Sequence, residues 1–144
     1  MGIVYEINRD LGTTVVLWGG MIGETAFLTH AHALCSDPLW PTPERLHLSD
    51  LRYVSLDSSM DNEVLEKGAA IYGSQRQKII GMKVAILSET EFERAVKFER
   101  ILMRYAASAI VFHSADVACT WLGLNDEKVR TVLKRLRSLS DLTL

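Results

Sequence analysis

A short apolar run in the second half of the chain places the strongest constraint on the fold. Residues 83–87 read Lys-Val-Ala-Ile-Leu, which is apolar almost throughout rather than alternating between apolar and polar side chains. A half-buried strand alternates with a period of two, whereas a strand covered on both faces does not. The run therefore predicts an interior strand, with helices packed against both faces of its sheet.

The rest of the chain supplies the other elements of such a fold. Residues 3–7 and 13–18 favour strands joined by a turn at residues 9–12, and glycines at positions 19, 20 and 23 are expected to end the second strand. Strands are also expected at residues 45–51 and 109–112, with residues 53–56 leading into a turn, and helices at residues 27–35, 60–73, 89–107, 115–122 and 126–139. Residues 74–78 are polar and are expected to form a linker. We therefore predict an α/β fold, in which a mixed sheet begins with a hairpin, continues with alternating helices and strands, and carries an extra C-terminal helix.

Composition argues against several classes of protein. The 144 residues are 48% apolar and carry a formal net charge of −2, which argues against a disordered chain and against a basic surface over the whole molecule. Cys35 and Cys119 are far apart and form no CxxC pair, so we expect neither a disulfide scaffold nor a zinc site, and a cytoplasmic location. The longest apolar stretch, residues 15–22, is too short to span a membrane.

The small net charge is unevenly divided along the chain. Residues 125–144 contain five Lys and Arg against three Asp and Glu, whereas residues 1–124 contain eleven against fifteen. The sequence therefore predicts a mildly acidic α/β domain over residues 1–124. Residues 125–144 are expected to form a basic amphipathic helix that packs on this domain or extends it.

A polar motif stands between the strand region at residues 53–56 and the helix expected from residue 60. Asp57-Ser58-Ser59 forms this motif, and Ser58 and Asp61 have the spacing of a capping box, in which the Ser58 hydroxyl accepts a hydrogen bond from a free helix N–H. A phosphate on Ser58 would face the positive end of the same helix, although Asp57 and Asp61 would repel it. Two interpretations therefore stay open: a helix cap, and a switch or partner-facing turn.

The position of this motif resembles the STAS superfamily, whose SpoIIAA-type members are anti-sigma-factor antagonists. In those proteins the first serine of an Asp-Ser-Ser/Thr-Gly-Leu-Gly stretch is phosphorylated by a partner kinase, whereas here Met60-Asp61-Asn62 stands in place of Gly-Leu-Gly. The wider SpoIIAA-like group, related in fold to lipid-binding SEC14 domains, is similar over three stretches: Leu48-Ser49-Asp50-Leu51-Arg52, Val111-Phe112-His113 and Ala118-Cys119-Thr120-Trp121-Leu122. The resemblance covers about residues 3–124. It implies a SpoIIAA-like fold and a regulatory or interaction module.

The C-terminal region also resembles a DNA-binding helix-turn-helix. Residues 115–138 place Gly123 at the turn between two helices and a cationic face on the second helix. Its candidate nucleic-acid contacts are Lys128, Arg130, Lys134 and Arg135. Two packed helices need the same glycine, and basic residues near a helix C-terminus are favoured by the helix dipole alone. A dimer or partner surface is therefore an equal alternative for this segment.

Few residues qualify as candidates for chemistry. His30 and His32 are two residues apart on one helix, so they point in different directions, and we expect both to be exposed. Glu99 projects from the middle of an apolar helix face, where it is expected to pair with an Arg or His or to lie in a ligand pocket. No nucleophile, base and orienting group can be assembled, so the sequence predicts no catalytic residues, no metal site and no cofactor.

These expectations combine into one leading hypothesis. The chain is expected to be a non-enzymatic regulatory or interaction module that binds a protein partner or a small apolar ligand between the sheet and its long helices. A homodimer is a further expected assembly, and a DNA-binding regulator is the alternative.

Overall fold

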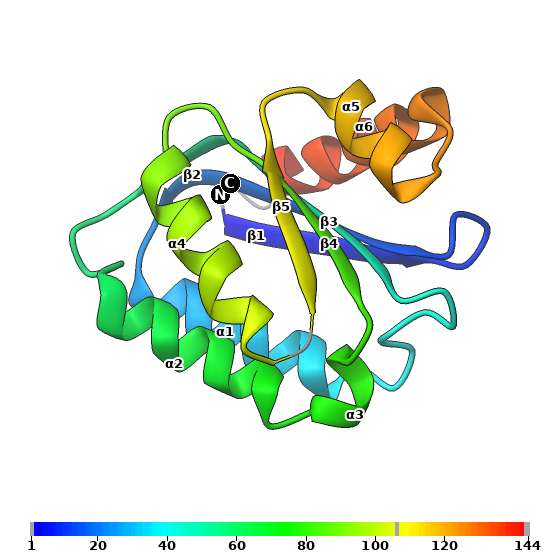
Figure 1. The fold of residues 1–144 in the computed structure, drawn as a ribbon. Coiled ribbons are helices and arrows are strands. Elements are labelled where there is room, and N and C mark those ends of the chain that lie inside the picture. The colour runs from blue at the N-terminus through cyan, green and yellow to red at the C-terminus, as the bar shows by residue number, and fades with distance from the viewer. Residues whose placement is uncertain (1, 106, 143–144) are drawn as a thin grey trace.

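The computed structural model describes residues 2–105 and 107–142, and it confirms the predicted fold class (Figure 1). Five strands form one mixed sheet in the order β1-β2-β3-β4-β5. The strands are β1 (Gly2–Asn8), β2 (Thr13–Ile22), β3 (Leu46–Leu56), β4 (Lys83–Leu87) and β5 (Ser108–Phe112), and the helices are α1 (Glu24–Ser36), α2 (Asn62–Gly73), α3 (Arg76–Ile79), α4 (Phe92–Met103), α5 (Ala115–Leu122) and α6 (Asp126–Leu142). The hairpin of β1 and β2 is antiparallel, and the pairs from β2 to β5 are parallel.

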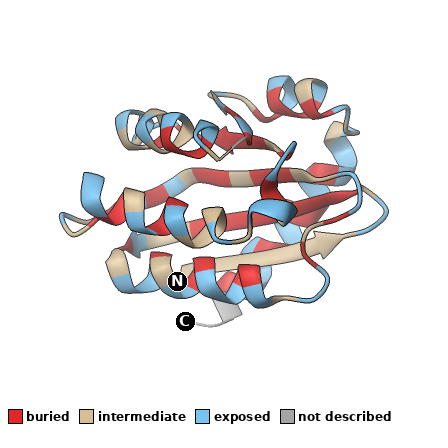
Figure 2. Cartoon of the chain, turned by 60° about the horizontal axis from the view of Figure 1, so that its bottom comes forward, coloured by how far each residue is buried: buried red, intermediate tan, exposed pale blue. Residues whose placement is uncertain are grey.

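The helices cover both faces of the sheet, as the apolar run in β4 predicts. Helices α1, α2 and α4 pack on one face, which we call the α1/α2/α4 face, and helices α5 and α6 pack on the other, the α5/α6 face (Figure 1). Each face has its own cluster of buried apolar side chains. In Figure 2 the interior strands are mostly buried, whereas β1 at one edge is of intermediate burial along its whole length.

Strand β2 continues through Gly19 and Gly20, two of the three glycines that were expected to end it, and stops just before the third, Gly23. It runs to Ile22 because its second half pairs with β3, where Gly20 lies opposite Val54 and Ile22 opposite Leu56. Gly20 has a φ of 73°, in the left-handed region that glycine adopts without strain. The prediction failed because the pairing partner is more than thirty residues away in the sequence.

Strand β3 is a single strand with a bulge, rather than a short strand followed by a turn. Leu17 pairs with Asp50 but Gly19 pairs with Tyr53, so β3 contains one extra residue at this point. A one-residue shift exchanges the two faces of a strand. As a result His47, Ser49 and Leu51 lie on the α1/α2/α4 face before the bulge, and Val54 and Leu56 lie on the same face after it.

Helix α4 is shorter than the predicted residues 89–107. The Glu91 carboxylate accepts a hydrogen bond from the Leu56 N–H at 2.8 Å, which holds the preceding residues as a loop, and the helix begins at Phe92. It ends at Met103, and the Tyr105 ring beyond it packs against Gly73, where a Cβ atom would lie 2.3 Å from the ring. Ala106, in the predicted helix, lies outside the described residues. The polar linker contains the short helix α3, which was not predicted.

The C-terminal helix packs on the α/β domain. Val129, Val132, Leu133 and Leu136 of α6 share a buried cluster with Val15, Leu17 and Leu48 of the sheet. Residues 143–144 of the predicted C-terminal segment lie outside the described residues. No helix in the described part of the chain combines the length and the apolar character that a membrane span needs.

Candidate functional site

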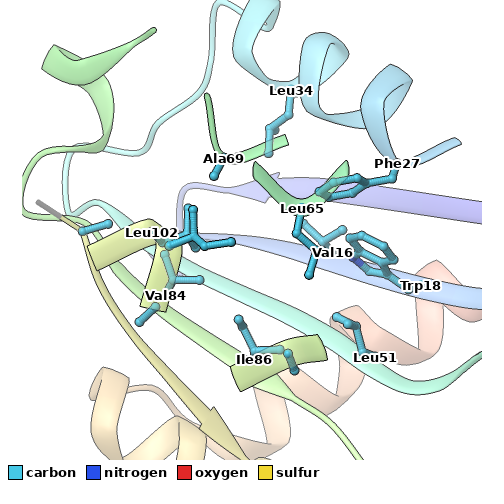
Figure 3. Close-up of a cluster of buried hydrophobic side chains, with 14 of the residues drawn as sticks. Val16, Trp18, Phe27, Leu34, Leu51, Leu65, Ala69, Val84, Ile86 and Leu102 are labelled. Carbon is cyan, nitrogen blue, oxygen red and sulfur yellow. The ribbon is translucent and has the colours of Figure 1, made fainter. Parts of the chain in front are cut away.

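A cavity of about 70 Å³ lies between the sheet and the three helices of the α1/α2/α4 face. Apolar side chains form most of its wall, including Phe27 of α1, Leu65 of α2, Leu102 of α4 and Ile86 of β4. Figure 3 shows these side chains converging between the helices and the strands. Because one water-sized probe occupies roughly 10–15 Å³, this space admits a small molecule or one end of a longer one.

One part of the cavity wall is polar. We define the polar wall as Trp18, His30, His47 and Ser49, all of which line the cavity. The register of β2 and β3 pairs Thr14 with His47 and Val16 with Ser49. Trp18 follows Val16 by two residues and lies on the same face, beyond Ser49. His30 on α1 packs edge-on against the Trp18 ring, with 6.1 Å between ring centroids. Two strands and one helix therefore position the polar wall.

The two histidines of the polar wall are held neutral. Each is 7% exposed, and burial lowers the pKa of His30 to about 4. Burial also lowers the pKa of His47 to about 3, with a smaller contribution from the nearby His30. The prediction of an exposed His30 is wrong, because residue 30 lies three positions after Phe27 and four before Leu34, on the buried face of α1. His32 is exposed, as expected.

Several polar atoms around the cavity have no hydrogen-bond partner. The Nε2 atom of His47 lies 2.9 Å from the Ser49 hydroxyl, but its Nδ1 atom is buried and unpartnered. The indole N–H groups of Trp18 and Trp40, which also line the cavity, are buried without an acceptor. Six buried side-chain polar atoms are unpartnered in the described part of the chain, and these three belong to cavity residues. Such groups are costly and uncommon, so their concentration around one cavity is informative.

The turn formed by Asp57, Ser58 and Ser59, called here the 57–59 turn, lies at the edge of the cavity. Leu56 and Met60 on either side of the turn line the cavity, while Ser58 is exposed and makes no hydrogen bond within the described residues. Arg94 of α4 donates to the carbonyl oxygens of Leu56 at 2.8 Å and Asp57 at 3.2 Å. The motif therefore places an exposed serine beside the cavity.

The expected cap by Ser58 is wrong. Helix α2 begins at Asn62, and its cap is Asp61, whose carboxylate accepts from the Val64 N–H at 2.9 Å. Ser59 instead caps the other helix, since its hydroxyl accepts from the Glu24 N–H at the start of α1 and donates to Asp57. Hydrogen bonds from the Ser59 hydroxyl and N–H lower the pKa of Asp57. The 57–59 turn is thus hydrogen-bonded to the start of α1 through Ser59, and it leads directly into α2.

Glu99 lies outside the cavity wall. Its carboxylate accepts a hydrogen bond from the Val111 N–H at 2.8 Å and fastens α4 to β5. Strand β5 is an edge strand of the sheet, so this N–H faces away from β4. The expected partner of Glu99 was an Arg, a His or a ligand, whereas the structure gives it a backbone group.

The four basic residues of the helix-turn-helix alternative divide into two pairs. Arg130 forms an ion pair with Asp126 at 2.8 Å, and Arg135 forms a two-point ion pair with Glu6, with distances of 2.8 and 2.7 Å. Lys128 and Lys134 are exposed and have no ion pair within the described residues. Gly123 ends α5 with a φ of 74°, as the turn prediction requires. DNA binding by this helix pair stays a prediction.

Comparisons with known proteins bear on the fold. No family model matches the chain, and no curated protein matches it. The chain is similar in structure to an uncharacterised protein of the DUF3478 family with a SpoIIAA-like fold, from Shewanella loihica PV-4. The match has a TM-score of 0.56 and 19% sequence identity, and covers 84% of this chain and 94% of the other. The fold is therefore SpoIIAA-like, as the resemblance of the motifs implies.

Proposed function

We propose that this protein is a non-enzymatic binding module that holds a small apolar ligand in the cavity of the α1/α2/α4 face. The observation that carries the proposal is the cavity itself, which is walled mainly by apolar side chains between the sheet and three helices. Interiors of folded proteins are close-packed, so a void of this size forfeits contacts that a ligand would restore. Apolar walls with a few polar groups are also the usual composition of ligand pockets.

Binding of cyclohexane tests this proposal. We expect it to raise the midpoint of thermal unfolding and to shift the NMR signals of cavity methyl groups such as those of Ile86 and Leu102. Methyl groups of Val129 and Leu136, in the buried cluster of the other face, should not shift. Equal shifts on both faces, or no shift on either, would contradict the proposal.

A matched pair of variants sharpens the test. Ala95 is buried and lines the cavity, so Ala95→Leu fills part of the space and should abolish the response to cyclohexane. Ala33 is exposed on α1, so Ala33→Leu makes the same chemical change away from the cavity and should leave binding intact. If Ala95→Leu does not fold, the methyl shifts of the unmodified chain still decide the question.

A protein partner at the 57–59 turn is a second candidate function. It is supported by the exposure of Ser58 beside the cavity, where an added group would be reached from solvent. Intact-mass analysis of the protein from its native cells should then show an added phosphate under some growth condition, and Ser58→Ala should remove it. Absence of the added mass under every condition would rule out phosphorylation of this residue.

A further inference from the structure

Besides its apolar side chains, the cavity wall contains buried polar groups without a hydrogen-bond partner in the described residues. The inference drawn from them rests on the proposed function. Trp18 is 7% exposed, and its indole N–H has no acceptor within the described residues. His47 is equally buried, and its Nδ1 atom is unpartnered. Both belong to the polar wall, on adjacent strands of the sheet. A purely hydrocarbon ligand would leave both groups unsatisfied.

We infer that the ligand is an uncharged, mainly apolar molecule with a hydrogen-bond-accepting oxygen that is directed at the indole N–H of Trp18. An indole N–H only donates, so its missing partner is an acceptor. A neutral imidazole donates from one nitrogen, and the Ser49 hydroxyl can donate to Nε2 of His47, which leaves Nδ1–H free to donate as well. A ketone, ester or ether oxygen matches either donor. His47 pairs with Thr14, four residues before Trp18 on β2, so a single oxygen is assigned to one of the two donors, the Trp18 N–H.

The charges around the cavity explain why the ligand is uncharged. Arg94 is the one Lys, Arg, Asp or Glu among the residues that line the cavity in the described part of the chain. Its guanidinium is already directed at the Leu56 and Asp57 carbonyls and lies 3.8 Å from the Glu91 carboxylate. The histidines of the polar wall are neutral at pH 7. A buried carboxylate would therefore find no free cation, and burying an unpaired charge is strongly unfavourable.

Three probes of matched shape test this inference: cyclohexane, cyclohexanone and cyclohexanecarboxylate. The chain has three tryptophans, and Trp121 packs against Phe112 on the α5/α6 face. In ¹⁵N NMR spectra we expect cyclohexanone to shift the indole N–H signal of Trp18 downfield, as a new hydrogen bond does, and to leave that of Trp121 unchanged. The carboxylate should not bind at pH 7.

Replacement of the donor separates this inference from the proposed function. Trp18→Phe keeps an aromatic ring and removes the N–H, and should lower the affinity for cyclohexanone about fivefold relative to the affinity for cyclohexane. Trp121→Phe, the matched control, should change neither affinity.

If Trp18→Phe changes both affinities equally, or if the carboxylate binds more tightly than the ketone, the inference is wrong and the proposed function stands. If neither cyclohexane nor cyclohexanone binds, both are wrong. The indole shifts of the unmodified chain decide the matter if Trp18→Phe fails to fold.

Discussion

The two faces of the sheet bury different kinds of side chain. On the α5/α6 face, the buried cluster consists of small and medium aliphatic residues and Cys119, with Val129, Val132 and Leu136 of α6 packed on Val15 and Leu17 of β2. The α1/α2/α4 face buries two tryptophans, two histidines and a phenylalanine, and it contains the cavity. A buried Trp N–H usually finds a hydrogen-bond partner, whereas those of Trp18 and Trp40 have none within the described residues. Under the proposed function, one face serves stability and the other combines stability with binding.

The largest expected effect compares a leucine from each face. Leu136 is 1% exposed within the closely packed cluster, so Leu136→Ala should lower the free energy of unfolding by about 2–5 kcal/mol. Leu102 is also buried but lines the cavity, where contacts on one side are already missing, so Leu102→Ala should cost less. Urea unfolding of both variants measures the difference. A larger loss for Leu102→Ala would contradict the proposed contrast between the faces.

The second prediction uses the buried histidines, which lie on the cavity side alone. His30 and His47 have folded-state pKa values of about 4 and 3, below the value of about 6.5 expected in an unfolded chain. Between these values the unfolded chain binds more protons than the folded one, so the free energy of unfolding falls as the pH is lowered below about 6.5. The slope is at most about 1.4 kcal/mol per pH unit for each histidine.

A pair of variants isolates this contribution from that of the carboxylates. His47→Gln should reduce the slope of unfolding free energy against pH between about pH 5 and 6.5. His32→Gln, on the exposed side of α1, should leave the slope unchanged. An unchanged slope in His47→Gln would mean that this side chain is solvated rather than buried in the polar wall.

His30 and His47 also show what the sequence could and could not predict. The order of helices and strands follows from local periodicity, and the buried place of His30 was readable from its spacing to Phe27 and Leu34. His47 shares a strand face with Ser49 and Leu51, as strand alternation allows. The cavity and the missing partners of the indoles depend on how three helices pack on the sheet. No local pattern encodes that packing.

The 57–59 turn is a second case in which local spacing was insufficient. Ser58 and Asp61 have the spacing of a capping box, yet the serine that caps a helix is Ser59, and its helix begins 35 residues earlier at Glu24. The two segments meet because β2 and β3 end side by side, with Ile22 opposite Leu56. A Cβ atom on Gly23 would lie 2.4 Å from the Asp57 carboxylate, so the close approach also depends on that glycine.

The third prediction tests the hydrogen bond between the Glu24 N–H of α1 and the Ser59 hydroxyl. Ser59→Ala removes the acceptor for the Glu24 N–H and should lower the free energy of unfolding by about 1 kcal/mol. Ser58→Ala changes an exposed side chain without a hydrogen bond in the described residues and should stay within about 0.5 kcal/mol of the unmodified chain. Chemical denaturation measures both. A larger loss for Ser58→Ala would restore the original capping interpretation.

The smallest expected effect concerns the attachment of α4 to the edge of the sheet. Glu99→Ala removes the acceptor for the Val111 N–H, which is worth about 0.5–1.5 kcal/mol for a typical hydrogen bond, and solvent at the edge strand should reduce the loss toward the lower figure. Glu93→Ala, on the exposed side of the same helix, is the control for loss of a carboxylate. Amide hydrogen exchange of Val111 should accelerate in Glu99→Ala and not in Glu93→Ala. Because Glu99 lies outside the cavity wall, neither variant should alter cyclohexane binding. Loss of binding in Glu99→Ala alone would show that the cavity depends on how α4 is held against β5, and would extend the binding face to this edge.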